Sequence, residues 1–422
     1  MRITLLTVPA RGDTEPFVAL AVRLKEAGHQ VKLAARPDFA SLAAQYDLEF
    51  APLGNPYQPF IAGAAEASAI GSGHLLNQIR YGLKQRRFVT EGLHQDALRA
   101  AQGSEAIIYK YPWITGHTVA EKLGVACAPA MLLPLIPTRE FPSFMLGRGI
   151  DRGQLLNQLF WRVPNELVWQ GLRWDDTRLR RQLGLRPRLI RRHPRPPEQR
   201  RDMPVFCAWS PTVLPRPADW PEHVSVTGYW FLDPPSDWQP PAELLRFLED
   251  GSPPVSVGFG SMASDDRQAT MRLVLEALEM SCQRAVLLSG WGGFGAGGDL
   301  PKHVFGAEGL PHSWLFPRMA AVVHHGGAGT TAAGLRSGVP SVLVPFLADQ
   351  PSWARVVHAL GAGPPAIPFQ ALTANRLADA IREAVTNPAM RQRAAAIAKE
   401  IRAEDGVGRA IELFLQYVAS FA

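Results

Sequence analysis

Residues 322–340 are VVHHGGAGTTAAGLRSGVP, and they carry the clearest structural signal in the chain. An apolar strand runs into His324 and His325, a glycine-rich turn follows, and Thr330 and Thr331 open a helix. Glycine lets the backbone approach an anion closely, and a helix N-terminus offers unpaired N–H groups and the positive end of its dipole. The stretch therefore predicts a phosphate-binding turn between a buried strand and a helix, with His325 as an additional hydrogen-bond donor.

Two common phosphate loops do not fit this turn. The Lys of the GxxxxGK[ST] loop is missing, and the glycines do not follow the GxGxxG spacing. A tight turn whose threonines only cap the helix is the alternative interpretation. Turn geometry alone does not require a doubled histidine before the glycines, so we favour the phosphate-binding interpretation.

Strands and helices alternate on both sides of this turn, which predicts a parallel sheet. In this half of the chain we expect strands at 255–258, 285–289, 320–324 and 341–344, helices at 268–280 and 331–337, and a helical close from 373 to 421. Ligands of such sheets bind at the carboxyl ends of the strands.

The first half of the chain has the same alternation. We expect strands at 3–8, 31–35 and 106–109, a helix at 16–27 with Pro16 in its first turn, and another at 117–123. A further strand candidate at 224–229 leads into DPPSDWQPP at 233–241, which has the composition of a linker. Two parallel-sheet domains joined by this linker are predicted.

Composition is consistent with such a protein. The chain has 422 residues, of which 46% are hydrophobic and 19% charged, with 37 Gly and 37 Pro. No apolar run of about 18 residues is present, and the N-terminus has the pattern of a first buried strand rather than a signal peptide. The three cysteines form neither a disulfide framework nor a zinc pattern, so we expect a cytoplasmic protein.

The net charge of +6 has a local source. Residues 173–201 contain eleven Arg and three acidic residues. Such a segment is a solvated loop or a surface that docks on anionic lipid, which would make the protein peripheral to a membrane. Apart from Trp174 at its start, no Phe, Trp or Tyr interleaves the run as base stacking would require, so no nucleic acid partner is expected.

The chain resembles a known family at several places. HHGGAGTT at 324–331 and PFLADQPSWA at 345–354 are similar to the donor signature of family 1 nucleotide-sugar glycosyltransferases. RGDTEP at 11–16 and the segment 210–233 resemble the sterol 3-β-glucosyltransferase-like branch and the bacterial antibiotic glycosyltransferases. The resemblance implies the GT-B fold, in which two Rossmann-like parallel-sheet domains face each other and a C-terminal helix returns to the first domain.

The resemblance also implies limits for these domains. An acceptor-binding domain would span 1–232 together with the helix at 400–422, a linker 233–242, and a donor-binding domain 243–399.

The family pattern implies a set of donor-binding residues in the second domain. His325 would contact the diphosphate, and Asp349 and Gln350 would bind hydroxyls of the sugar, because a carboxylate accepts and an amide donates. The alternative for Asp349 is an ordinary helix N-cap before Pro351. The other implied donor residues are Ser261, Leu310, His312, Gly327, Ala328, Gly329 and Thr330.

Two of these assignments leave alternatives open. Many relatives have a Trp where this chain has Gly309, next to the loop that binds base and ribose, so the nucleobase is left open. Ser261 stands where the family has a phosphate-side serine, and a solvated turn serine is the alternative.

Asp13 is the expected catalytic base, because the related branches place an Asp in this loop and an inverting transfer needs a group that takes the proton of the acceptor hydroxyl. The alternative makes Asp13 the N-cap of a helix that starts at Pro16. Gly12, Met131, Phe141 and Phe144 are the expected acceptor contacts. Core packing is the alternative for the three large residues.

Together these features predict inverting transfer of a hexose from a nucleoside diphosphate sugar, with UDP-glucose as the expected donor, to a hydroxyl of a hydrophobic acceptor such as a sterol or polyphenol. No metal is expected, since no Asp-x-Asp spacing is present, and no resident cofactor either. A hydrolysing sugar-nucleotide epimerase of GT-B fold is the alternative. A nicotinamide-dependent oxidoreductase does not fit, because PARGDTEP follows the first strand where GxGxxG is needed.

Overall fold

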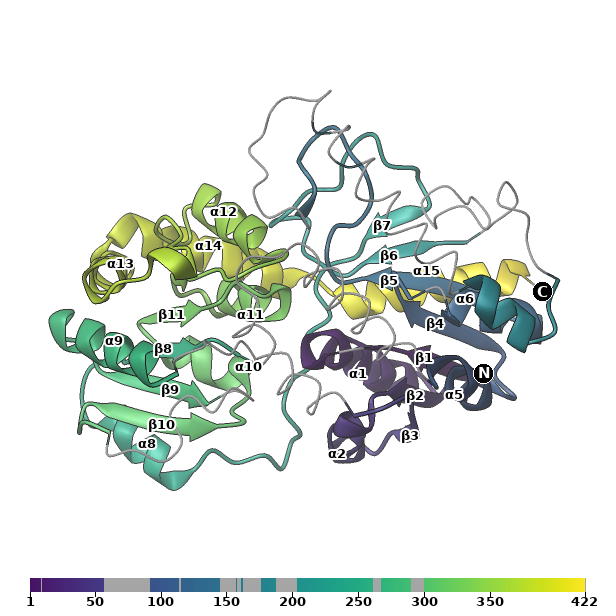
Figure 1. Cartoon of the computed structure of the whole chain (residues 1–422), viewed down its shortest axis with the longest axis horizontal. Coiled ribbons are helices and arrows are strands. Elements are labelled where there is room, and N and C mark those ends of the chain that lie inside the picture. The colour runs from purple at the N-terminus through teal and green to yellow at the C-terminus, as the bar shows by residue number, and fades with distance from the viewer. Residues whose placement is uncertain are drawn as a thin grey trace.

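The structure is a computed structural model of the whole chain. It describes residues 1–8, 10–56, 92–113, 115–144, 157, 161, 176–186, 203–260, 267–289 and 300–421. Two parallel sheets lie side by side in Figure 1, each with its own helices.

The first sheet contains seven parallel strands in the order β3-β2-β1-β4-β5-β6-β7. Its strands are β1 (Arg2–Leu6), β2 (Gln30–Ala35), β3 (Glu49–Pro52), β4 (Ala106–Lys110), β5 (Ala126–Met131), β6 (Val205–Cys207) and β7 (Val224–Val226). The helices in this part of the chain are α1 (Arg11–Glu26), α2 (Ala40–Gln45), α5 (Leu93–Ala101) and α6 (Thr115–Leu123).

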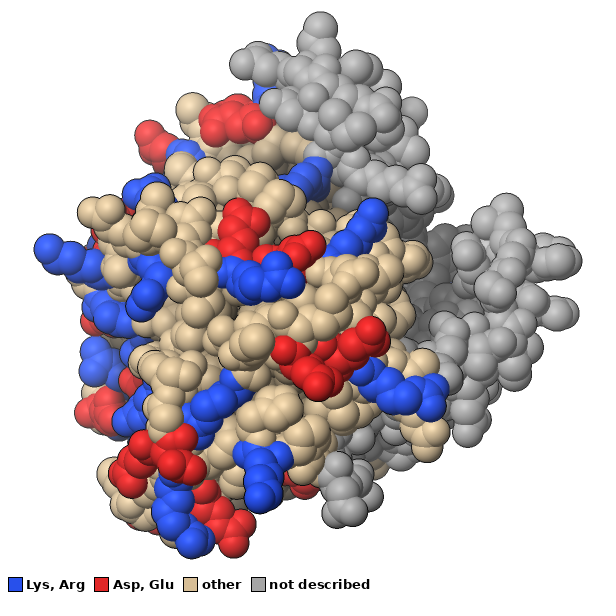
Figure 2. Space-filling model, turned by 90° about the vertical axis from the view of Figure 1, so that its left-hand side faces the viewer, with Lys and Arg blue, Asp and Glu red and all other residues tan. Residues whose placement is uncertain are grey.

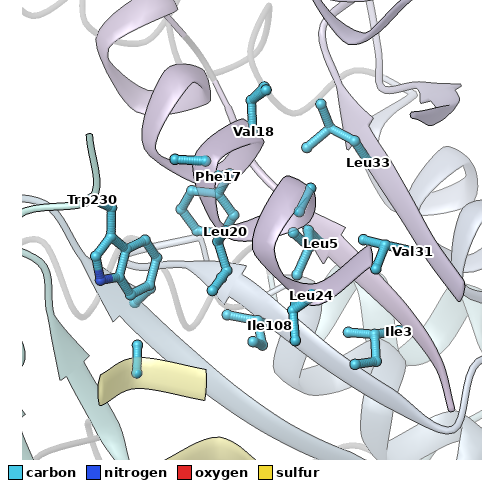
Figure 3. Packing of buried hydrophobic residues seen from close by; sticks show 14 of the residues in the cluster. Ile3, Leu5, Phe17, Val18, Leu20, Leu24, Val31, Leu33, Ile108 and Trp230 are labelled. Atoms are coloured by element: carbon cyan, nitrogen blue, oxygen red, sulfur yellow. The ribbon is translucent and has the colours of Figure 1, made fainter. Parts of the chain in front are cut away.

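Apolar side chains of α1 cover one face of this sheet. Figure 3 shows Phe17 and Leu20 of α1 above Leu5 of β1, with Trp230 beside Phe17. The rings of Phe17 and Trp230 meet edge to face at 5.9 Å. Burial of these apolar side chains is the dominant favourable contribution to folding, and their packing fixes the position of α1 over β1.

The second sheet contains five parallel strands in the order β10-β9-β8-β11-β12. Its strands are β8 (Val255–Gly258), β9 (Ala285–Ser289), β10 (Val304–Glu308), β11 (Ala321–His324) and β12 (Ser341–Leu343). Its helices are α8 (Ala242–Glu249), α9 (Arg267–Met280), α10 (His312–Leu315), α11 (Ala328–Ser337), α12 (Gln350–Ala359), α13 (Ala374–Thr386) and α14 (Pro388–Ala403).

The last helix, α15 (Gly406–Phe421), returns to the first domain. It runs along the first sheet in Figure 1, where its Phe414 packs against Phe206 of β6. The chain crosses from α14 to α15 at a very close contact, because a Cβ on Gly406 would lie 2.5 Å from the carbonyl oxygen of Tyr229. The predicted GT-B fold and the returning helix are therefore confirmed.

Each sheet has a point where the strand order changes direction. In the first sheet this point lies between β1 and β4, and in the second between β8 and β11. Ligand sites of open α/β sheets lie at the carboxyl ends of the strands at such points. The loops after β1, β4, β8 and β11 are therefore the places to look for a site.

Most expected elements are present, but the first helix begins earlier than predicted. It starts at Arg11 rather than Pro16, because the Ala10 carbonyl accepts hydrogen bonds from the N–H groups of Asp13 and Thr14. Pro16 lies in the second turn, where it donates no bond to the helix. The expected domain limits at 232, 242 and 399 stay predictions.

Charge on the outer face of the second domain is mixed. Figure 2 shows acidic and basic side chains interspersed over this face, with no large area of a single sign among the described residues. Among those residues, no helix is both long and apolar enough to cross a membrane.

The crossing at Gly406 leads to a stability prediction. Gly406→Ala places a methyl group against the backbone of Gly228 and Tyr229, so we expect it to lower the free energy of unfolding by about 1–3 kcal/mol. Gly329→Ala is the control, because its new methyl group meets nothing within 4 Å. Thermal and denaturant unfolding of both variants measures the difference, and equal stability would contradict the tight crossing.

Candidate active site

The turn after β11 brings two histidines to the switch point of the second sheet. His324 ends β11, and its Nδ1 accepts a hydrogen bond from the N–H of Gly326 at 3.1 Å. The neutral ring therefore carries its proton on Nε2. Gly326 has φ +87°, a conformation that L side chains rarely adopt, so this glycine is needed to turn the chain into α11.

The ring of His325 packs against Gly260 and Gly327, two glycines from different loops, which we call the glycine seat of His325. A Cβ on Gly260, after β8, would lie 3.1 Å from the ring, and a Cβ on Gly327 would lie 2.5 Å from its Nε2. Its Nδ1 is buried and has no hydrogen-bond partner in the described part of the chain. His325 thus brings an unpaired polar nitrogen to the start of α11.

The N-terminus of α11 lies at the same place. Gly327 is its N-cap residue, and Ala328, Gly329 and Thr330 form its first turn. The first N–H groups of a helix lack intrahelical partners, and the helix dipole favours an anion beside them. The predicted geometry of strand, glycine turn and helix start is therefore present.

Burial makes the imidazoles at this site hard to protonate. It lowers the pKa of His325 to about 4, with a smaller contribution from the nearby His312. Burial also lowers the pKa of His312 and, more strongly, that of His324. All three rings are neutral at pH 7 in the free protein, so the helix amides rather than imidazolium charges make this end of the sheet attractive to anions.

The loop that would bind the base and ribose is well packed. Leu310 is buried in a cluster with Leu315 and Phe316, and the ring of His312 stacks on Phe316 with 4.4 Å between centroids. Gly309 has φ +64°, which a Trp at this position would not readily adopt.

Asp349 is held by the helix that follows it. Its Oδ2 accepts a hydrogen bond from Trp353 Nε1 at 2.9 Å, and its side chain makes no N-cap bond to α12. Burial raises the pKa of this carboxyl. The preceding residue, Ala348, has φ +57°, a strained conformation of the kind that concentrates at binding sites.

Gln350 differs from the expectation in one respect. It is only 6% exposed, and its Oε1 accepts hydrogen bonds from the N–H groups of Phe346 and Leu347 at 2.8 and 3.2 Å. The amide oxygen is therefore used to hold the loop. Only the Nε2 group is left to donate to a ligand.

On the first sheet, Asp13 pairs with a residue that the sequence did not indicate. Lys110 is the last residue of β4, and its Nζ lies 2.8 Å from Asp13 Oδ1. Asp13 Oδ2 accepts a hydrogen bond from the Ala10 N–H at 3.1 Å. A Lys that ends a buried apolar strand is an unusual position for a cation, and this was the one available signal.

The two sets of residues lie near each other although they come from different sheets. The charges of Asp13 and Lys110 both act on the pKa of Asp349, the first raising it and the second lowering it. The charges of Glu15 and Arg11 of α1 likewise act on the pKa of His312, the first raising it and the second lowering it. Asp13 is therefore near enough to the loop that carries Asp349 for their charges to interact.

The expected acceptor contacts are mostly packed into the protein. Met131 is 0% exposed, and Phe144 contacts Trp353 of the second domain with 4.9 Å between ring centroids. Phe141 is partly exposed and packs edge to face on Phe144. Gly12 lies in the first turn of α1 with free space where a Cβ would stand. Of the four, Gly12 and Phe141 have surface that a ligand could contact.

Two predictions lie wholly or largely outside the described residues. Ser261 is outside them, and only 176–186 of the arginine-rich segment are inside. Within that part, Arg180 forms a buried two-point pair with Glu121, with distances of 2.7 and 2.9 Å. Arg180 therefore has a structural role, while lipid docking by the segment stays a prediction. In the part of the chain that the structure describes, no group of three or more His, Cys, Asp or Glu could hold a metal ion.

Two family models match the two halves of the chain. Residues 3–138 match the glycosyltransferase family 28 N-terminal domain. Residues 295–407 match the C-terminal domain of erythromycin biosynthesis protein CIII-like proteins.

Curated relatives match along the whole chain. It is 37% identical to a sterol 3-beta-glucosyltransferase of Arabidopsis thaliana, over 99% of this chain and 68% of that protein. It is 35% identical to O-mycaminosyltylonolide 6-deoxyallosyltransferase of Streptomyces fradiae, over 99% of this chain and 97% of that protein. Fungal sterol 3-beta-glucosyltransferases are longer, and the chain spans 27% of the one from Cryptococcus neoformans.

Solved structures with the same fold cover 99% of the chain. The glycosyltransferase of kitacinnamycin aligns with a TM-score of 0.68 at 20% identity, over 98% of its own length. The glycosyltransferase SsfS6 of Streptomyces sp. SF2575, complexed with thymidine diphosphate, aligns with a TM-score of 0.62 at 18% identity, over 99% of its length.

The neutral histidines predict how stability depends on pH. The folded pKa of His325 is about 4 and its ordinary value is 6.5, so between these pH values the unfolded state binds more protons. Stability should therefore fall as the pH drops below 6.5, and His325→Gln should remove part of this loss. Melting temperatures at pH 7 and pH 5 measure it. His358→Gln, on an exposed position of α12, should show the same loss as the wild type; an unchanged loss in His325→Gln would contradict the assignment.

Proposed function

This chain belongs to the GT-B glycosyltransferases, alongside sterol glucosyltransferases and antibiotic glycosyltransferases, and from that membership we propose that it transfers glucose from UDP-glucose to a hydroxyl of a hydrophobic small molecule. The transfer inverts the anomeric carbon and uses no metal. The observation that carries the proposal is that the carboxylate of Asp13, in the first domain, is near enough to Asp349, in the second, for its charge to raise the pKa of Asp349, which brings a proton acceptor of one domain toward the expected donor end of the other.

The diphosphate of the donor binds at the start of α11. The N–H groups of Ala328, Gly329 and Thr330 donate to phosphate oxygens, and His325 adds a ring N–H. An anion beside His325 stabilises its protonated form, so bound diphosphate offsets part of the burial that lowers its pKa in the free protein. A structure of the same fold was solved in complex with thymidine diphosphate, which supports a nucleoside diphosphate as the ligand.

The sugar is held by the loop before α12. The Oδ1 of Asp349 accepts from a sugar hydroxyl, while Oδ2 stays on Trp353. Gln350 donates from Nε2, since its Oε1 is used by Phe346 and Leu347. One acceptor and one donor suffice to bind two neighbouring hydroxyls and orient the ring.

The chemical step is a single displacement. The acceptor hydroxyl oxygen attacks the anomeric carbon from the face opposite the diphosphate, and its proton passes to the carboxylate of Asp13. The bond between the anomeric carbon and the diphosphate oxygen breaks, and its electron pair stays on that oxygen. The α11 amides stabilise the developing charge, which is the role a divalent ion has in other transferases.

The epimerase alternative is not favoured. It would need donor and water alone, whereas the related proteins named above are transferases. Incubation of the chain with UDP-glucose, with and without a sterol, flavonoid or macrolide, separates the two reactions. Acceptor-dependent release of UDP and a product whose anomeric configuration is opposite to that of the donor support the proposal; consumption of UDP-glucose without acceptor and with a changed sugar would contradict it.

The glycine seat of His325 predicts a loss of nucleotide binding. In Gly327→Ala the new methyl group would lie 2.5 Å from Nε2 of His325 and displace the ring. We expect the affinity for UDP to fall at least ~10-fold, the loss of one or more charge-assisted hydrogen bonds. Gly12→Ala, in the first domain, whose methyl group meets no protein atom within 4 Å, should lose much less. Calorimetric titration with UDP measures the affinity of both variants. Equal losses of affinity would contradict a role of the Gly327 contact in holding the ring of His325.

Asp13→Asn should separate binding from chemistry. The amide accepts no proton, so kcat should fall by about 10²–10⁴-fold, while the affinity for UDP changes less than ~2-fold. Asp96→Asn is a matched control, because Asp96 also lies in the first turn of a helix, accepts a backbone N–H and pairs with an Arg. Steady-state kinetics and UDP titration give both quantities; parallel loss of binding and turnover would remove Asp13 as the base.

A further inference from the structure

Lys110 is a buried cation at the switch point of the first sheet. The residue is 7% exposed, and its ammonium group lies 2.8 Å from Asp13 Oδ1. Burying an ammonium group is costly unless it is paired, so this position is occupied by Lys at the expense of stability. A residue retained under that cost has a role that an apolar strand residue could not fill.

The contacts of Asp13 show what this role is. Lys110 holds Oδ1, and the Ala10 N–H holds Oδ2 at 3.1 Å. The backbone N–H fixes only one oxygen, so without Lys110 the carboxylate could rotate about its last bond. With both donors present, the plane of the carboxylate is fixed and its remaining lone pairs point in defined directions.

Lys110 also acts across the domain boundary. The negative charge of Asp13 raises the pKa of Asp349, and the positive charge of Lys110 lowers it. Lys110 thus pairs directly with Asp13, while its effect on Asp349 is the longer-range effect of its charge. Without it, the two negative charges would repel each other where the domains meet.

We propose that Lys110 is the positioning residue of the transfer site: it holds the Asp13 carboxylate toward the acceptor hydroxyl. This inference rests on the proposed function. Lys110 acts through Asp13, and itself touches neither the diphosphate nor the sugar.

The first test separates positioning from donor binding. Lys110→Met keeps an unbranched apolar side chain but removes the cation, so kcat should fall by about 10–100-fold. The affinity for UDP and the KM for UDP-glucose should change by less than about 3-fold. Lys110→Arg restores a donor at the end of the side chain, and should recover a large part of the lost kcat while its different shape leaves some of the defect.

Lys32→Met is the matched control for these variants. Lys32 lies on β2 of the same sheet and pairs with Glu49 at 3.1 Å, away from the switch point. Its kcat should equal that of the wild type. Weakening of UDP binding by Lys110→Met to the same extent as kcat would make Lys110 a diphosphate contact and overturn the inference, as would a Lys110→Met variant as active as Lys32→Met.

A second measurement does not depend on turnover. A double-mutant cycle compares Asp13→Asn, Lys110→Met and the double variant. Denaturant midpoints should show that the stability losses of the two single variants do not add up in the double variant, because either substitution alone already removes the ion pair. Additive effects would overturn the pairing while leaving the proposed function intact. Coupling without any acceptor-dependent turnover in the wild type would instead remove the proposed function and keep the pairing.

Discussion

The contact between Gly228 and Gly406 sets the geometry on which everything else depends. A Cβ on Gly228 would lie 3.0 Å from the Cα of Gly406, so two backbone segments touch where the chain returns to the first domain. Glu404, beside this crossing, accepts hydrogen bonds from Ser210 and Thr212. A site shared by two sheets needs such a fixed crossing, because each half of the site would otherwise move independently of the other.

The two switch points give each domain a different part of the task. At the first, α1, which follows β1, carries Asp13 and β4 ends at Lys110, and this pair suits the handling of a proton. At the second, β11 leads into α11, whose free amides suit an anion. The division follows from topology, since a switch point leaves room for a ligand at the strand ends and each sheet has one. What each end does depends on the few residues that follow the strands.

Local signals in the sequence were enough for much of this picture. The strands at 255–258 and 285–289 were predicted at their observed bounds, because alternating apolar runs with clear breaks define them. The start of α1 was misplaced, since Pro16 suggested a first turn while the bonds of Ala10 start the helix five residues earlier. The unusual place of Lys110 at the end of an apolar strand was visible in the sequence, but its pairing with Asp13 and the partners of Gln350 were not, because they depend on contacts between strands and loops that the chain order does not reveal.

The state of the histidines changes how the anion site has to be understood. The sequence indicated His325 as a hydrogen-bond donor to the anion, and its pKa of about 4 leaves the ring neutral in the free protein. Attraction for the donor therefore comes from oriented amides, which need no proton and are present at every pH at which the protein is folded. The ring of His325 is neutral before binding, and negative charge beside it favours its protonation. It therefore stabilises the diphosphate most when the negative charge on the diphosphate is greatest. In the proposed reaction that moment is the departure of the diphosphate, so burial of His325 would direct its stabilisation toward the transition state rather than toward the empty site.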